Sequence, residues 1–158
     1  MCKIAQTRAI LRLVGKSCPR ASLYSEKPEE AAVIDSFLDF EEDLFAALRC
    51  SVFPVRWGWD DYKDEDDKKA RRSKIAAEVM TPKLEILEKA LQASSTGWVA
   101  GTAGPSIADF ALAVSIGWVN GGIVDGVEAG YMDKFPGISD YLKRFSEMPE
   151  IKSYYEKK

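Results

Sequence analysis

Apolar side chains recur along most of the chain at spacings of three and four residues, a pattern that indicates amphipathic helices. The clearest case follows Pro28 and predicts a helix over residues 28–52, capped by Ser25 and bent or ended by Pro54. Its apolar positions are Val33, Ile34, Phe37, Leu38, Phe40, Leu44, Phe45 and Leu48.

A shorter helix is predicted near the start of the chain, ended by Gly15 or by Pro19. Its apolar stripe consists of Ile4, Ile10, Leu11 and Val14. A further helix is expected to run through residues 75–91, with Pro82 as a kink and the letters "SSTG" as its end.

Two short amphipathic helices are predicted near the end of the chain, around residues 138–145 and 151–155. No stretch shows the alternation of apolar and polar residues that is typical of strands. The sequence therefore predicts an all-α fold, a bundle around one buried helix.

The stretch "GPSIADF" supplies the start of that buried helix. Ser106 is expected to be its N-cap, and Asp109, three residues later, can accept the backbone N–H of Ser106 in a capping box. The residues that follow are almost all apolar, so we expect the helix to be buried on all sides: Phe110, Leu112, Val114 and Ile116.

Composition limits the classes of function. A chain of 158 residues with a formal net charge of −3 has no general attraction to nucleic acid, and no apolar run reaches the ~20 residues of a membrane span. The absence of histidine excludes Ser-His-Asp and Cys-His nucleophiles. Three scattered cysteines, Cys2, Cys18 and Cys50, cannot close a zinc site alone, so no metal is expected.

The cysteines also bear on the compartment. An odd number of cysteines without a C-x-x-C pair favours a reducing, cytoplasmic location. The first 25 residues carry several basic residues and no acidic one, which is also typical of an organelle import signal.

Two segments together resemble the glutathione transferase family. "GPSIADF" is similar to the capping box of the family's central helix, and "FPGISDYLKRFSEMPEIKSYYEK" is similar to the end of its C-terminal domain. The resemblance implies an all-α helical bundle of the glutathione transferase C-terminal type over residues 19–158. Residues 1–18 resemble only the last helix of the family's thioredoxin-like domain, so they are expected to be its remnant.

The resemblance also implies site residues. "AQTRAILRLVGK" is similar to a helix that opens with Gln-Ser or Gln-Thr in alpha- and sigma-like classes, where the pair binds the γ-glutamyl end of glutathione. Gln6 and Thr7 are therefore candidate ligands of glutathione, and Thr7 is alternatively a simple helix cap. Asp43 aligns with an acid that reaches the glutathione amine across the family's dimer; alternatively, it is only a solvated acid.

Aromatic side chains after the long helix suggest where an electrophile would bind. "FPVRWGW" offers Phe53, Trp57 and Trp59 as an apolar wall. No catalytic residue is assigned, because the resemblance places the group that activates the thiol before residue 6. Cys2 is a stand-in thiol only if its terminus is ordered.

Two functions therefore remain as hypotheses. In the first, an intact protein conjugates its substrate glutathione to electrophiles, and the 158-residue chain alone is inactive. In the second, the chain is a non-enzymatic module that binds a protein partner. A homodimer through the helix at 28–52, or a hetero-assembly, is expected to cover the apolar residues of the first two helices.

Overall fold

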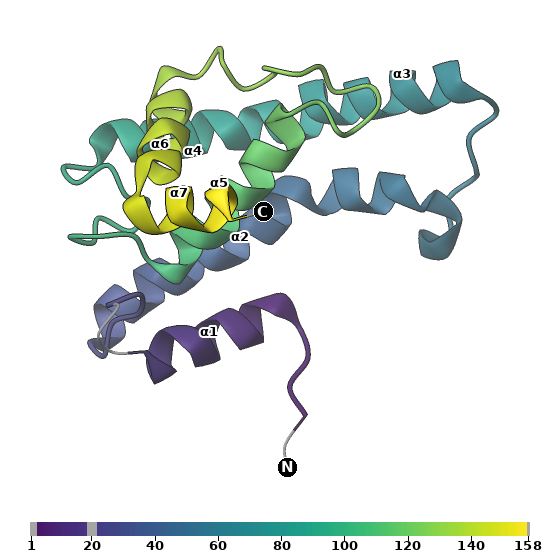
Figure 1. The fold of residues 1–158 in the computed structure, drawn as a ribbon. Helices are drawn as coiled ribbons and strands as arrows, with labels where there is room; N and C mark the ends of the chain where they lie inside the picture. Colours follow the sequence, from purple (N-terminus) through teal and green to yellow (C-terminus); the bar gives the residue numbers. More distant parts are fainter. Residues whose placement is uncertain (1–2, 19–21, 158) are drawn as a thin grey trace.

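The computed structural model describes residues 3–18 and 22–157, and this part of the chain contains helices and no strand (Figure 1). The expected all-α class is confirmed. In chain order the elements are α1 (Thr7–Ser17), α2 (Pro28–Val52), the 3-10 turn η2 (Pro54–Trp57), α3 (Glu65–Ile75), the π turn η3 (Ala76–Met80), α4 (Thr81–Ala93), α5 (Ile107–Asn120), α6 (Pro136–Glu147) and α7 (Pro149–Glu156).

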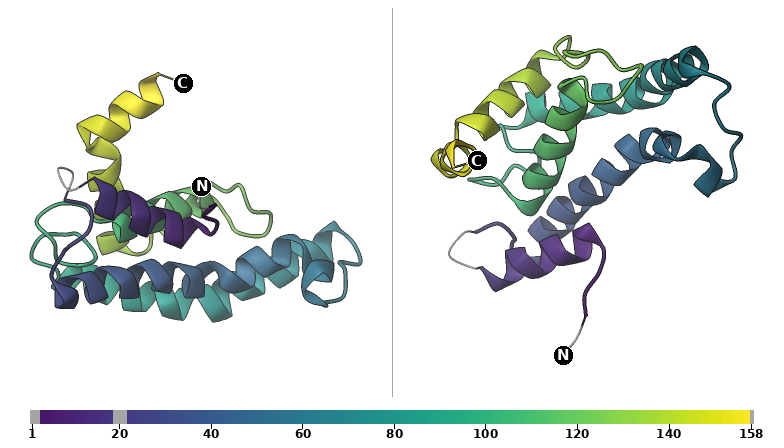
Figure 2. Two further views of the ribbon diagram at one scale, coloured as in Figure 1. Left: turned by 90° about the horizontal axis from the view of Figure 1, so that it is seen from below. Right: turned by 45° about the vertical axis from the view of Figure 1, so that its right-hand side comes forward.

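Two long helical runs lie side by side and form the base of the bundle (Figure 2). One run is α2, and the other is the continuous stretch α3–η3–α4, which returns along it. The helix α5 packs on α2, and α6 packs on both α4 and α5. Side chains of α2, η3, α4, α5 and α6 therefore share one core.

The predicted bounds of α2 are confirmed, but its cap is not Ser25. The N-cap position is Lys27, which makes no side-chain capping bond. Ser25 lies just outside, where its Oγ accepts the N–H of Lys27 at 3.2 Å and donates to Glu30. Two acidic residues and a proline in the first turn suit the positive end of the helix without a side-chain cap.

The kink expected at Pro82 takes the form of the π turn just before it. Proline has no N–H to donate to the preceding turn, so the register must change nearby. The hydroxyl of Thr81 donates to the carbonyl of Ala76 at 3.0 Å and lies 2.8 Å from the hydroxyl of Tyr131. The helix therefore continues through the proline, and it ends at Ala93, before "SSTG" as predicted.

The capping box of α5 is present, and the start of this helix is buried as expected. The expectation that α5 is buried on all sides is wrong. Val114 and Trp118 are about half exposed, at 52% and 49%, and they lie four residues apart on one face. That face is open because the neighbouring helices cover only the remainder of α5.

The apolar residues of α2 are less exposed than expected. Leu38, Phe45 and Leu48 are buried within the chain, and Phe37 and Phe40 pack partly buried against the core. These five side chains therefore leave less apolar surface on α2 for a partner to cover than the sequence predicts.

The predicted apolar stripe of α1, together with Ile4 just before the helix, is mostly exposed. Ile4, Ile10 and Val14 are exposed, and Leu13 joins them, whereas Leu11 packs against the core. Gly15 does not end the helix, which continues to Ser17. A Cβ on Gly15 would lie 2.9 Å from Ile107 and 3.0 Å from Tyr24, so the glycine allows α1 to approach α5 closely.

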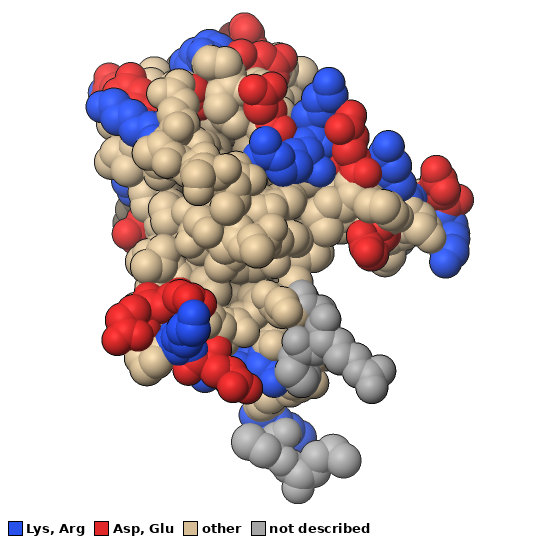
Figure 3. Space-filling model, turned by 90° about the vertical axis from the view of Figure 1, so that its left-hand side faces the viewer, with Lys and Arg blue, Asp and Glu red and all other residues tan. Residues whose placement is uncertain are grey.

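Charged side chains on the face shown in Figure 3 lie mainly around its edges, with both signs interspersed. A broad stretch without Lys, Arg, Asp or Glu occupies the centre of that face. Within the described ranges, none of the helices combines the length and the apolar character needed to cross a bilayer.

Candidate ligand-binding site beside the first helix

An apolar cavity of about 420 Å³ opens between the C-terminal half of α2 and the exposed face of α5. Most of its lining is aliphatic or aromatic, which is typical of sites for small apolar molecules. The lining residues are Phe45, Leu48, Arg49, Val52, Phe53, Val114, Ser115, Trp118, Val119 and Val124, and we refer to this cavity as the α2–α5 pocket.

The N-terminus of α1 has the features of an anion site. The N–H groups of its first turn precede the first intrahelical bond, from the N–H of Ile10 to the carbonyl of Gln6 at 3.1 Å. The first turn contains no acidic residue, and the N-cap, Gln6, makes no side-chain capping bond. The positive end of this helix therefore has neither an acidic side chain nor a side-chain cap of its own.

Gln6 also has a strained backbone, with φ 75° and ψ 120°. A side chain at positive φ costs of order 1–3 kcal/mol, and such residues gather at functional sites. The alternative that Thr7 is the cap is wrong, because the cap position is Gln6 and Thr7 is the first helical residue.

Four charged side chains connect α1 to the α2–α5 pocket. Arg8 of α1 and Arg49 of α2 each contact both Glu41 and Glu42, so the four groups form a closed ring of alternating charge. The Nη2 of Arg8 lies 2.8 Å from Glu41, and the Nη1 of Arg49 lies 2.9 Å from Glu42. Burial lowers the pKa of Arg8, but Glu42 and Glu41 together raise it above its ordinary value.

Glu41 is the buried member of this ring, at 5% exposure. Its Oε1 also accepts the hydroxyl of Ser115, which lines the pocket. A buried carboxylate is stable only when its lone pairs are satisfied, and here three donors from three helices do so. Arg8, Arg49 and Ser115 are therefore held around one carboxylate. This carboxylate connects the first turn of α1, through Arg8, to the wall of the pocket, through Arg49 and Ser115.

A second pair of contacts fixes the other half of α1. Arg12 donates to Asp35 at 2.7 Å and to Asp39 at 2.9 Å, and Asp35 also accepts the hydroxyl of Tyr24 at 2.8 Å. The hydrogen bond to Asp35 raises the pKa of Arg12 above its ordinary value. The helix α1 is thus bound to α2 by arginines along one side, while Ile10, Leu13 and Val14 remain exposed.

The other candidate residues are placed differently. Phe53 lines the α2–α5 pocket, whereas Trp57 and Trp59 are exposed and do not line it. Asp43 is exposed, and its backbone carbonyl accepts a hydrogen bond from Lys83. Cys2 lies outside the described residues.

The structure adds pocket residues that the pattern did not indicate. Val114, Ser115 and Trp118 line the pocket from α5, although an almost wholly apolar helix predicts burial instead. Nothing in the local sequence indicates that Glu41 meets Ser115, which is 74 residues away.

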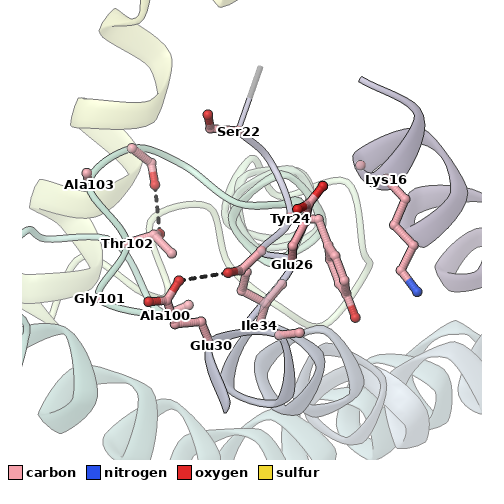
Figure 4. A pocket seen from close by; sticks show the side chains of 14 residues that line it. Lys16, Ser22, Tyr24, Glu26, Glu30, Ile34, Ala100, Gly101, Thr102 and Ala103 are labelled. Atoms are coloured by element: carbon pink, nitrogen blue, oxygen red, sulfur yellow. Dashed lines mark hydrogen bonds between the residues drawn. The ribbon is translucent and has the colours of Figure 1, made fainter. Parts of the chain in front are cut away.

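A second cavity, of about 940 Å³, lies at the opposite end of α1 and is shown in Figure 4. Lys16 stands on one side and the loop of residues 100–103 on the other. The Nζ of Lys16 lies 5.1 Å from the ring centre of Tyr24, a cation–π contact. None of the candidate residues lines this cavity. Across residues 3–18 and 22–157, no cluster of three or more Asp, Glu, Cys or His side chains could hold a metal ion.

Residues 56–158 match the family described as "Glutathione S-transferase, C-terminal domain". No protein with a curated description matches the chain. The match covers most of the chain and includes α3 to α7.

Solved structures share the fold over nearly the whole chain. A glutathione transferase homolog from Sulfitobacter with bound glutathione is 21% identical, with a TM-score of 0.73 over 98% of this chain and 68% of that one. A Pi-class glutathione S-transferase from Onchocerca volvulus is 22% identical, with a TM-score of 0.67 over 98% and 65%. A monomeric glutathione S-transferase from Necator americanus is 23% identical, with a TM-score of 0.65 over 98% and 69%. At these identities the likeness establishes the fold.

Proposed function

The chain belongs to the glutathione S-transferase family through its C-terminal domain, and we propose that it contributes two parts of a glutathione-conjugating site. The first part is the N-terminus of α1, where Gln6 and Thr7 would bind the γ-glutamyl carboxylate. The second is the α2–α5 pocket, which would hold the apolar body of an electrophile. In the conjugation the glutathione thiolate would form an S–C bond at the electrophilic carbon. Either a leaving group then departs from that carbon with its bonding electrons, or an activated double bond opens and takes up the thiol proton at its other end.

One observation carries the proposal: Arg8 connects the two parts. It follows Thr7 in the sequence, and its guanidinium meets the same buried carboxylate, Glu41, as Arg49 and Ser115 of the pocket wall. A tripeptide held at the helix end would therefore lie next to the mouth of the pocket. Holding two reactants side by side is itself a large part of catalysis, because it removes the entropy cost of their encounter.

The residues of α1 would act mainly on the ligand's charge. The N–H groups of residues 7–9 and the positive end of the helix favour a carboxylate by about 0.3–1 kcal/mol for exposed groups. None of these donors lies at the sulfur end of the tripeptide, so they bind and orient it without lowering the pKa of the thiol. We therefore expect the 158-residue chain to bind glutathione weakly and not to turn it over by itself.

Nuclear magnetic resonance on the labelled full chain tests this proposal. Millimolar glutathione is expected to shift the backbone amide signals of Thr7, Arg8 and Ala9. The dipeptide cysteinylglycine, which lacks the γ-glutamyl carboxylate, is the matched control and is expected to leave them unchanged. Gln6→Ala should weaken the response. Equal responses to the two peptides, or shifts confined to other helices, would contradict the proposal.

A further inference from the structure

The α2–α5 pocket has a polar corner in an otherwise apolar lining. Besides the indole N–H of Trp118, the lining has two hydrogen-bonding side chains, Arg49 and Ser115, and both reach the Oε1 of Glu41. The corner is therefore a single feature. It lies on the side of the pocket that faces α1, because Arg8 contacts the same carboxylate.

The charges of this corner cancel. The ring contains two guanidinium groups, of Arg8 and Arg49, and two carboxylates, of Glu41 and Glu42, so its formal charge is zero. A neutral ring gives little Coulomb attraction to an anion, which must still lose water to enter an apolar cavity. A carboxylate-bearing ligand is therefore disfavoured here despite the arginine.

Hydrogen-bond donors remain available at the corner. A guanidinium has five N–H groups, and the contacts of Arg49 with the two glutamates use its Nη1 and Nη2 once each. Its side chain is 42% exposed, so the remaining donors can meet a ligand. The hydroxyl proton of Ser115 is committed to Glu41, so of the two polar side chains at this corner Arg49 is the one with donors to spare.

We propose that Arg49 determines the specificity of the α2–α5 pocket by selecting neutral, mainly apolar compounds that carry a hydrogen-bond acceptor, such as a carbonyl or nitro oxygen. Glu41 and Ser115 are positioning residues, which hold the guanidinium at the wall. A pure hydrocarbon would cover the donors of Arg49 without pairing them, and this has a cost. The inference deepens the proposed function, but it requires only that the pocket binds ligands.

Three compounds with one phenylalkyl body test the selection: the hydrocarbon, the methyl ketone and the carboxylate. Their dissociation constants for the full chain are measured from the indole N–H signal of Trp118, assigned with Trp118→Phe. We expect the ketone to bind about three- to tenfold more tightly than the hydrocarbon, as one hydrogen bond allows, and the carboxylate to bind worst. Arg49→Met should make ketone and hydrocarbon equal. Arg71→Met removes the same charge from α3, away from the pocket, and should leave the three dissociation constants unchanged.

The charge argument has its own test in Glu42→Gln. This variant leaves the buried Glu41 in place but gives the ring a net charge of +1, and Glu42 is 48% exposed, so folding is not at risk. The carboxylate compound should then bind about tenfold more tightly than to the original chain, with the gain shrinking as salt is raised. Glu41→Gln should also make the carboxylate compound bind more tightly.

Three results would overturn the inference: a preference of the original chain for the carboxylate, an unchanged order of affinities in Arg49→Met, or no gain for the carboxylate in Glu42→Gln. No glutathione is present in these measurements. A failure here is therefore distinct from a failure of the α1 terminus to bind the tripeptide.

Discussion

The backbone N–H of Val99 donates to the Oδ1 of Asp109 at 3.0 Å, across the loop that precedes α5. The other oxygen, Oδ2, accepts the N–H of Ser106 at 2.7 Å and the hydroxyl of Ser106 at 2.8 Å. The predicted capping box therefore accounts for only some of the hydrogen bonds that this buried carboxylate accepts. Asp109 starts its own helix and also holds the loop to it.

Asp109→Ala is predicted to destabilise the fold by about 2–4 kcal/mol, because it strands buried donors of Val99 and Ser106. Urea denaturation followed by circular dichroism measures the change. Asp140→Ala is the matched control, since Asp140 is an exposed acid on α6, and its effect is expected to stay within about 0.5 kcal/mol. A loss for Asp109→Ala no larger than that of the control would mean that the box does not hold the helix.

The same carboxyl predicts a pH dependence. Burial raises the pKa of Asp109, against the hydrogen bonds from Val99 and Ser106, which lower it. The folded chain then holds this proton more tightly than the unfolded chain does, so acidification favours folding through this group. The contribution of this protonation to the free energy of unfolding is complete below the unfolded pKa of about 3.9. It is lost as pH rises through the pKa of Asp109 in the folded chain.

We therefore expect the difference in unfolding free energy between the original chain and Asp109→Ala to be larger at pH 4 than at pH 7. Carbon NMR of the labelled carboxyl gives the pKa directly. A value at or below that of a model peptide would show that the hydrogen bonds outweigh burial.

The sequence predicted helices and caps wherever the signal was local. The helix at 28–52 and the box at Ser106 and Asp109 depend on neighbours within a few residues, and both are present. Contacts over long distances had no such signal. Glu88 of α4 caps α6 by accepting the N–H groups of Gly137 and Ile138, each at 2.9 Å, although it lies 49 residues before Gly137.

The candidate site shows the same division. A helix that opens with "QT" can be found by pattern, and so can an aromatic residue such as Phe53 at a helix end. Whether α5 exposes Val114 and Trp118 depends on which helices pack against it. The spacing of apolar residues along the chain does not predict this packing. The ring of Arg8, Glu41, Glu42 and Arg49 also depends on tertiary packing, since one arginine comes from another helix.

Substitution of two glycines by alanine is predicted to change the stability of the fold in opposite directions. At Gly15 a Cβ would lie within 3.0 Å of both Ile107 and Tyr24, so Gly15→Ala is expected to loosen α1 from α5. At Gly117, in the middle of α5, a Cβ would meet nothing within 4 Å, so Gly117→Ala should stabilise by about 0.5–1 kcal/mol through helix propensity. Denaturation midpoints compare the two variants. Stabilisation by both would show that α1 is not closely packed.

The last prediction concerns association of the chain through α1. Ile10, Leu13 and Val14 are 43%, 47% and 44% exposed and lie within one turn of each other. Burying each such side chain is worth about 1.5–3 kcal/mol. Covering them with a second copy or with another protein would therefore make a favourable contribution to the free energy of association. The large apolar residues Leu38, Phe45 and Leu48 of α2 contribute little to association, since they are already buried within the chain.

We expect the purified chain to associate as its concentration rises into the tens of micromolar, measured by light scattering after size exclusion. Leu13→Asp should shift it towards the monomer. Ile86→Asp is the matched control, because Ile86 is an exposed residue on α4, at 58%, and a charge there leaves the face of α1 intact. A monomer at every concentration that also fails to bind an apolar dye would contradict the prediction. A monomer that does bind the dye at α1, and loses this binding in Leu13→Asp, would show that a different protein covers the face.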